Sequence, residues 1–371
     1  MKNPFHHIRF GVNYVPSRKW WYCWNDFQPE DLARDFDAIA AMGADHLRIM
    51  LIWPYFQPNR NWISPAHLDR LEILMSLAAE RELDVCVTPL TGWLSGWAFR
   101  PNFDRPHDFF TAPEMREPVA LYLRSCAERL NRHVNFLGFD LGNEINCCWE
   151  TKTLAEGDAW MDWVFALCET VSPGRIHVNG VDHQPWFYPM TFSAENLAKR
   201  PKLVAIHSWI EFTGARLRGS STDRVCTHLA PAMAALVRAR AGNTGKPVWL
   251  QEFGASSEWM KAEDIPGFLE SSVRASIAGG ICWITWWDSH NIRPEFQFPS
   301  LEYDLGLLDV DNRLKPAGKA FQSLSREFRG KAVCSPPDIA LPTLAVADPA
   351  NFETTIENTW HWLEAVQQRI E

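Results

Sequence analysis

Eight short apolar segments alternate with longer amphipathic segments along most of this 371-residue chain. Short apolar runs of this kind are typical of strands that are buried on both faces, as in a parallel sheet covered by helices. The expected strands span residues 9–15, 45–53, 83–90, 136–144, 175–181, 203–209, 246–253 and 281–288. We therefore expect an α/β fold. Its eight strand–helix units fit a (β/α)8 TIM barrel, which needs about 250 residues plus insertions.

The amphipathic segments carry start and stop signals for helices. Pro29 stands in the first turn of a helix expected over 29–42, and Gly43 follows its end. Ser64 and Pro65 are a favourable N-cap and first residue for the next helix. Further helices are expected near residues 113–132, 154–171, 193–199, 221–240, 264–278, 315–328 and 354–370. Pro231 lies inside one of these segments, so we predict a kink or a break there.

An open, doubly wound sheet is the structural alternative to a barrel. Such a sheet usually carries a glycine-rich phosphate-binding turn after its first strand, whereas residues 13–16 here read Asn-Tyr-Val-Pro. We therefore predict that residues 1–330 form one catalytic (β/α)8 barrel. Residues 331–371 start with a proline-rich stretch and end in an expected helix. They are predicted to be a C-terminal extension that packs on the barrel, not a second domain.

Composition excludes several classes of partner and location. The net charge is −9 and no block of Lys and Arg occurs, which argues against binding to nucleic acid. No run of about 20 apolar residues is present, so we expect no membrane span. The first eleven residues contain no apolar core of a secretory signal, and the cytoplasm is the expected compartment. The nine cysteines include Cys86, Cys168 and Cys282 inside apolar runs, where they are interpreted as small hydrophobic residues.

Two glutamates end apolar runs in a way that suggests catalysis. Glu144 follows Leu-Gly-Asn at the end of the fourth expected strand, and Glu252 follows Leu-Gln at the end of the seventh. In a barrel, the C-terminal ends of the strands surround the active site, and strands 4 and 7 lie roughly opposite each other. The two carboxyl groups can therefore meet, although 108 residues separate them. Such a pair can cleave a glycosidic bond, with one acid and one carboxylate beside the scissile oxygen.

Tryptophan is the compositional outlier, with 19 residues. Indole rings pack on the C–H faces of sugars, and the indole N–H can bond a hydroxyl group. Trp93 and Trp149 lie in loop-like segments and are candidates for sugar contact, with packing of long loops as the alternative.

The motifs around these glutamates resemble the clan of retaining (β/α)8-barrel glycosidases, and within it glycoside hydrolase family 5. The resemblance covers residues 10 to about 328. It implies that Glu144 in Asn143-Glu144 is the acid/base and that Glu252 in Gln-Glu-Phe-Gly is the nucleophile. It also implies that Arg48 in Leu-Arg-Ile is the clan's strand-2 arginine.

Further substrate-binding residues follow from the same resemblance. His207 and Trp209 match the family's histidine and aromatic residue near strand 6, and Trp286 matches its strand-8 tryptophan, with Trp287 as the alternative register. One departure concerns strand 3, where the family usually has a histidine and residues 88–93 here read Thr-Pro-Leu-Thr-Gly-Trp. This departure implies a remodelled subsite −1.

The expected mechanism follows from charge. Glu252 has to be ionised for attack, and Arg48 favours that form, while a neighbouring carboxylate raises the pKa of Glu144 so that it keeps its proton. A retaining pair lies about 5–5.5 Å apart, and Asn143 can bond the sugar 2-hydroxyl. No cofactor is required. No His-x-His motif ends a strand, so no metal site is expected either.

The opening segment 11–17, with Tyr14 and the nearby Trp20, Trp21 and Trp24, resembles the exo-β-mannosidase branch of family 5. The expected activity is therefore retaining removal of a terminal β-linked sugar, with β-mannose favoured, from short oligosaccharides. A β-glucosidase, a β-galactosidase, an endo-β-mannanase and a sugar-binding barrel without turnover are the alternatives. The oligomeric state stays open.

Overall fold

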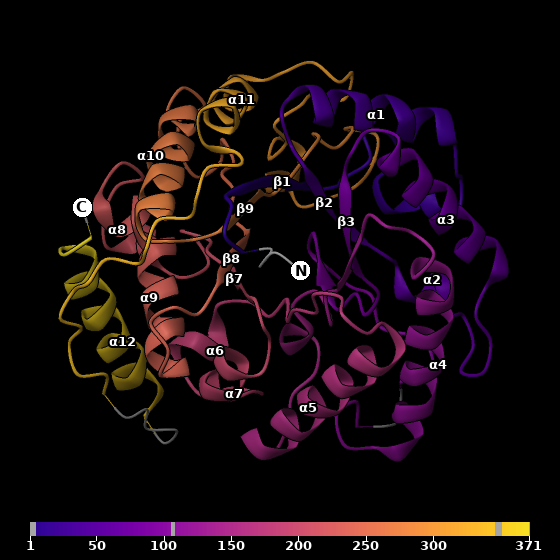
Figure 1. Cartoon of the computed structure of the whole chain (residues 1–371), viewed down its shortest axis with the longest axis horizontal. Helices are drawn as coiled ribbons and strands as arrows, with labels where there is room; N and C mark the ends of the chain where they lie inside the picture. Colours follow the sequence, from indigo (N-terminus) through magenta and orange to yellow (C-terminus); the bar gives the residue numbers. More distant parts are fainter. Residues whose placement is uncertain (1–4, 105–107, 346–350, 371) are drawn as a thin grey trace.

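A computed structural model describes residues 5–104, 108–345 and 351–370, and its centre is a curled sheet of seven parallel strands (Figure 1). The strands are β1 (Arg9–Asn13), β2 (His46–Met50), β3 (Asp84–Thr88), β6 (Phe136–Phe139), β7 (Val204–His207), β8 (Val248–Glu252) and β9 (Trp283–Trp286). Their order is β6-β3-β2-β1-β9-β8-β7, and each neighbouring pair is parallel. The first and last strands along the chain, β1 and β9, are therefore hydrogen-bonded to each other.

An outer ring of helices surrounds this sheet (Figure 1). Its main members are α1 (Pro29–Ala41), α3 (Pro65–Ala79), α4 (Pro113–Leu130), α5 (Leu154–Val171), α7 (Ala194–Lys199), α9 (Leu229–Ala241), α10 (Ile265–Ala278) and α11 (Pro316–Phe328). Shorter helices are η1 (Trp20–Trp24), α2 (Trp53–Phe56), η2 (Ile145–Cys147), α6 (Gln184–Phe187), η3 (Ala215–Leu217), α8 (Arg224–Thr227) and η4 (Ser300–Tyr303). The arrangement confirms the expected (β/α)8 class.

Local signals explain where several helices begin. The Ser64 hydroxyl accepts a hydrogen bond from the His67 N–H, as predicted for an N-cap. Thr153 and Glu156 form a capping box at the start of α5, which satisfies two backbone donors that the helix leaves free. The predicted break is also present, because α8 ends at Thr227 and α9 starts at Leu229. Pro231 has no N–H for the Thr227 carbonyl, so the two helices cannot merge.

The fifth expected strand is the main departure from the sequence-based prediction. Residues 175–181 form a single parallel bridge, between Val178 and Asp140, instead of a regular strand. The Ile176 and Val178 amides donate to β6 carbonyls at 2.8 and 2.9 Å, so the segment extends the sheet on that side. No backbone hydrogen bond joins residues 175–181 to residues 203–209, all of which the structure describes. The barrel therefore has a seam at this place.

The C-terminal helix α12 (Phe352–Gln367) lies outside α9 (Figure 1). Its Trp360 and Leu363 are buried, and the Thr359 hydroxyl donates to the Phe187 carbonyl at 3.0 Å. Arg218 forms ion pairs with Glu357 and Glu364 of this helix. Residues 346–350 and 371 of the predicted extension lie outside the described residues.

Two composition-based expectations bear on the described chain. All nine cysteines lie in described residues and are free thiols, and Cys86, Cys168 and Cys282 are buried, which confirms their packing role. Across residues 5–104, 108–345 and 351–370, we found no helix long and apolar enough to cross a bilayer.

Candidate active site

The two glutamates that the sequence singles out reach the same place in the barrel. Glu252 is the last residue of β8, and Glu144 follows β6 at the start of η2. The Glu144 backbone is left-handed, with φ 47°, which is uncommon for a residue with a side chain. One carboxylate oxygen of each glutamate and one ring nitrogen of His207 all lie within 4.8 Å of one another. The fold therefore brings together two carboxyl groups that are remote in sequence.

Arg48 organises one side of this group from the centre of β2. Its guanidinium is fully buried and donates to Asp140 at 2.8 Å, to Asn13 at 3.0 Å and to Asn143 at 2.6 Å. It also forms a short ion pair with Glu252. Burial lowers the pKa of Arg48, but the charges of Asp140 and Glu252 raise it further, so the net shift is upward. A fixed cation therefore stands beside the Glu252 carboxyl group.

His207, at the end of β7, connects the two glutamates. Its Nδ1 lies 2.8 Å from Glu144 Oε1 and 3.3 Å from Glu252 Oε2, and its Nε2 donates to the Gln251 side-chain carbonyl at 3.0 Å. With Nε2 protonated, Nδ1 either accepts a proton from Glu144 or donates one to its carboxylate. Glu144 and His207 therefore share one proton between them.

The surroundings of Glu144 and His207 shift the pKa of each. The pKa of Glu144 is raised to about 7, chiefly because burial penalises its charged form; the Glu252 charge also raises it and the His207 hydrogen bond lowers it. The expectation from sequence named the neighbouring charge as the cause, whereas desolvation is larger. For His207, burial lowers the pKa, and the Glu252 charge and the Glu144 hydrogen bond outweigh this effect, so the net shift is upward. Glu144 can thus hold a proton near neutral pH.

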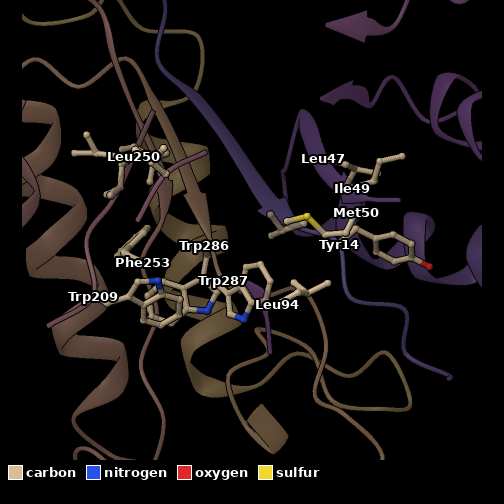
Figure 2. Close-up of a cluster of buried hydrophobic side chains, with 14 of the residues drawn as sticks. Tyr14, Leu47, Ile49, Met50, Leu94, Trp209, Leu250, Phe253, Trp286 and Trp287 are labelled. Carbon is tan, nitrogen blue, oxygen red and sulfur yellow. The ribbon is translucent and has the colours of Figure 1, made fainter. Parts of the chain in front are cut away.

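Glu144 and Glu252 line a cavity of about 870 Å³, a volume that includes the space open to solvent at its mouth. Its lining consists of Trp93, Leu94, Ser95, Gly96, Asn143, Glu144, Trp209, Phe212, Glu252, Trp287, Pro299, Leu301 and Glu302. The Trp209 indole N–H donates to Glu252 Oε2 at 3.2 Å, and Figure 2 shows Trp209 close to Trp287. Carboxyl groups between aromatic walls suit a sugar, whose C–H faces pack on indole rings.

Gly254 allows Trp287 and Trp209 to lie very close to its backbone. A Cβ atom on Gly254 would lie 2.4 Å from the Trp287 carbonyl oxygen and 2.8 Å from the Trp209 ring. Only glycine leaves room for both contacts, so the residue two positions after Glu252 sets how closely the tryptophans flank its carboxylate.

Metal binding was tested on the same residues. In the part of the chain that the structure describes, Glu144, His207 and Glu252 form the one group whose atoms are close enough to hold an ion together. The Arg48 guanidinium already contacts Glu252, so a divalent cation here would be repelled by a fixed positive charge. The donor set therefore fits proton transfer better than metal coordination.

Comparison with known proteins identifies the family. No protein-family model and no curated protein sequence matches the chain. GH5_18 from Streptomyces cattleya, solved in complex with GlcNAc, is 35% identical over 87% of this chain and 80% of that chain, with a TM-score of 0.84. The chain belongs to GH5_18, a subfamily of glycoside hydrolase family 5. It is a glycoside hydrolase.

Two other solved structures are similar to this GH5_18 enzyme. GH5_18 from Bifidobacterium longum subsp. infantis is 28% identical over 88% of this chain and 81% of that chain, with a TM-score of 0.83. The exo-β-1,4-mannosidase of Opitutaceae bacterium strain TAV5 is 24% identical over 87% of this chain and 60% of that chain, with a TM-score of 0.77. The second likeness supports the barrel fold alone.

Five of the eight predicted substrate-binding residues do not line the cavity of the GH5_18 enzyme: Tyr14, Arg48, Trp149, His207 and Trp286. Arg48 and His207 instead contact the two glutamates. The Tyr14 hydroxyl donates to Asp35 at 2.9 Å, and in Figure 2 its ring points away from Trp209 and Trp287. Trp149 is buried, and its indole N–H bonds Asp104 at 2.9 Å. Trp286 donates to the Leu305 carbonyl and packs on Phe253. The next residue, Trp287, which is the alternative register, lines the cavity; its peptide bond to Asp288 is cis.

Sequence reasoning missed several residues of this GH5_18 site. Asp140 and Asn13 hold Arg48, and Thr88 at the end of β3 donates to Asp140 at 2.9 Å, where the family usually has a histidine. The position of Asp140 just after β6 could have revealed it, because strand ends face the site. Glu302 lies in η4, a loop without hydrophobic periodicity, and no signal in the sequence marks it.

Proposed function

We propose that this GH5_18 enzyme is a retaining exo-β-mannosidase, which removes a terminal β-linked mannose from short oligosaccharides by double displacement. The observation that carries the catalytic part is the approach of Glu144 and Glu252 to within 4.8 Å in one cavity. This distance joins one oxygen of each carboxyl group, and it is compatible with the separation of about 5–5.5 Å between the groups in retaining enzymes, against roughly 6.5–9.5 Å in inverting ones.

The substrate part of the proposal has support from relatives. The Streptomyces cattleya GH5_18 was solved with GlcNAc, and a variant of it with Manb1-4GlcNAc. A variant of GH5_18 from Bifidobacterium longum subsp. longum was also solved with Manb1-4GlcNAc. A disaccharide of this kind, with mannose at its non-reducing end, is the substrate that we assign to the present enzyme.

The roles of the two glutamates follow from their surroundings. Glu252, beside Arg48, attacks the anomeric carbon and forms the glycosyl-enzyme bond while the bond to the leaving oxygen breaks. Glu144, whose pKa is about 7, gives its proton to that oxygen. Formation of the covalent intermediate neutralises Glu252, which lowers the pKa of Glu144. Glu144 then takes a proton from the water that hydrolyses the intermediate.

Other lining residues would position the sugar. Asn143 accepts from Arg48 and donates to the Trp93 carbonyl, so its amide is held in one orientation on the cavity wall, where we assign it the 2-hydroxyl contact. Trp287 would stack on the terminal sugar. Trp93 and Phe212, which are 39% and 55% exposed, would contact the sugar that leaves.

A panel of nitrophenyl glycosides tests the activity and the sugar together. We expect the β-mannoside to be cleaved with a kcat/KM at least tenfold above the β-glucoside and β-galactoside, and mannotetraose to yield mannose as the first product. Release of mannobiose from within mannotetraose would favour an endo-β-mannanase. Binding without release on every glycoside would favour a sugar-binding barrel.

Azide rescue tests the nucleophile. Glu252→Ala is expected to lower turnover of an activated β-mannoside by at least 10⁴-fold, on the order found for loss of an essential catalytic group. Azide should then restore release and give the α-mannosyl azide. Glu258→Ala, a change of an exposed glutamate six residues later, is the matched control and should keep wild-type turnover. Absence of rescue, or a β-configured azide, would contradict the assignment.

A further inference from the structure

A third carboxyl group, that of Glu302, faces the same cavity and has no part in the double displacement. Glu302 belongs to η4, in the loop after β9, and is 7% exposed. It lines the cavity together with Glu144 and Glu252. A carboxyl group is seldom buried to this extent unless other groups bind it.

One oxygen of Glu302 lacks a partner. Its Oε2 is buried and makes no hydrogen bond to any described residue. By contrast, Glu144 is bonded by His207, and Glu252 is bonded by Arg48 and Trp209. An unpaired buried acceptor is costly, and such atoms in a ligand cavity are the ones that a ligand's donors satisfy.

The residues around Glu302 form one wall of the cavity. The turn between β4 (Trp93–Leu94) and β5 (Trp97–Ala98) packs against the η4 loop, because a Cβ on Gly96 would lie 2.4 Å from the Pro299 side chain. The Trp20 indole N–H donates to the Ser95 hydroxyl at 3.3 Å and holds this turn from behind. A sugar chain that enters the cavity therefore meets a wall, with Glu302 in it.

The surroundings of Glu302 shift its pKa and indicate which lining residue it lies beside. Burial raises the pKa of Glu302 to about 7, and hydrogen bonds from Ser95 and Trp287 lower it. The charges of Glu252 and Glu144 raise it as well, and the effect of Glu252 is the larger of the two. The hydrogen bond from Trp287 places Glu302 beside the residue to which the proposed function assigns the terminal sugar, and both residues line the cavity.

We propose that Glu302 accepts hydrogen bonds from hydroxyl groups of the terminal sugar, and that this contact with the wall behind it selects the chain end for cleavage. The proposal rests on the proposed function of the cavity. A sugar hydroxyl supplies the donor that Oε2 lacks, and its loss leaves a buried acceptor unpaired, which penalises substrates without that hydroxyl.

Deoxy substrates test this contact directly. Wild-type enzyme and Glu302→Ala are compared on nitrophenyl β-mannoside and on its 3-, 4- and 6-deoxy analogues. In the wild type, removal of a hydroxyl that Glu302 binds should lower kcat/KM by about 10- to 100-fold, as for a hydrogen bond to a charged group. In Glu302→Ala, kcat/KM for the parent substrate should fall by a similar factor. In this variant, removal of the same hydroxyl from the substrate should lower kcat/KM by less than a further threefold.

Control variants distinguish loss of the Glu302 contact from loss of folding and from failure of the proposed function. Glu295→Gln, at an exposed glutamate in the same loop, should keep the wild-type penalty for each deoxy substrate. Glu302→Gln, which keeps an acceptor for Ser95 and Trp287, provides a second variant if Glu302→Ala does not fold. If the wild type cleaves no β-mannoside, the proposed function fails. If it does, but deoxygenation costs the same with and without Glu302 at all three positions, this inference is overturned.

Discussion

Glu302→Gln should make the protein more stable at alkaline pH than the wild type. The folded state raises the pKa of Glu302 from 4.5 to about 7, mainly because burial disfavours the charge. A group with a raised pKa contributes stability that is fully present below pH 4.5 and is lost as the pH rises through 7. A shift of this size corresponds to about 3 kcal/mol, at roughly 1.4 kcal/mol for each unit. Glutamine has nearly the same shape and no charge, so the variant avoids this loss.

Guanidinium chloride unfolding, followed by tryptophan fluorescence at several pH values, measures the effect. The quantity of interest is the free energy of unfolding of Glu302→Gln minus that of the wild type. We expect this difference to rise by about 2–3 kcal/mol between pH 5 and pH 8.5, from the linkage relation. Glu263→Gln, at an exposed glutamate, should show a flat difference over the same range. A change below about 0.5 kcal/mol for Glu302→Gln would refute the argument that burial controls this carboxyl group.

Two further predictions concern residues whose roles the structure separates. Trp287→Phe should lower kcat/KM for the β-mannoside about tenfold with little loss of stability, because Trp287 lines the cavity. Trp286→Phe should instead lower the free energy of unfolding by about 1–3 kcal/mol and leave KM nearly unchanged, since Trp286 is fully buried against Phe253; the reverse pattern would show that the assigned register is wrong. Tyr14→Phe should cost about 1–2 kcal/mol of stability through the lost bond to Asp35, with unaltered KM. A raised KM would place Tyr14 in the substrate site after all.

Most of the fold could be predicted from the sequence, but the ends of strands could not. The second strand was expected over 45–53, and β2 stops at Met50. The Leu51 amide still donates to the Thr88 carbonyl of β3 at 2.9 Å, whereas the Ile52 amide has no such bond although Ile52 is also fully buried, so burial continues where pairing stops. Hydrophobicity reports burial, while strand ends are set by hydrogen-bonding partners from other parts of the chain. The same limit explains why residues 175–181 were expected to form a regular strand.

In the site, the glutamates were easier to predict than the aromatic residues. The rule that strand ends face the active site places Glu144 and Glu252 without knowledge of side-chain packing. A tryptophan serves equally well in a core or against a sugar, so composition could not separate Trp149 from Trp209. Side chains alternate along a strand, and a shift of one residue exchanges Trp286 for Trp287. Glu302 depends on a loop conformation that no periodic pattern encodes.

The seam between residues 175–181 and β7 has a consequence for how the barrel fluctuates. The amides of His177 and Asn179 lack a backbone acceptor there, whereas those of Ile176 and Val178 bond to β6. Separation of residues 175–181 from β7 breaks no backbone hydrogen bond between them, so it costs less free energy than separation of any hydrogen-bonded strand pair. Deuterium should therefore enter the barrel first at His177 and Asn179. The Glu144 amide donates to the Gly180 carbonyl, so the loop that carries Glu144 is attached to the segment that borders the seam.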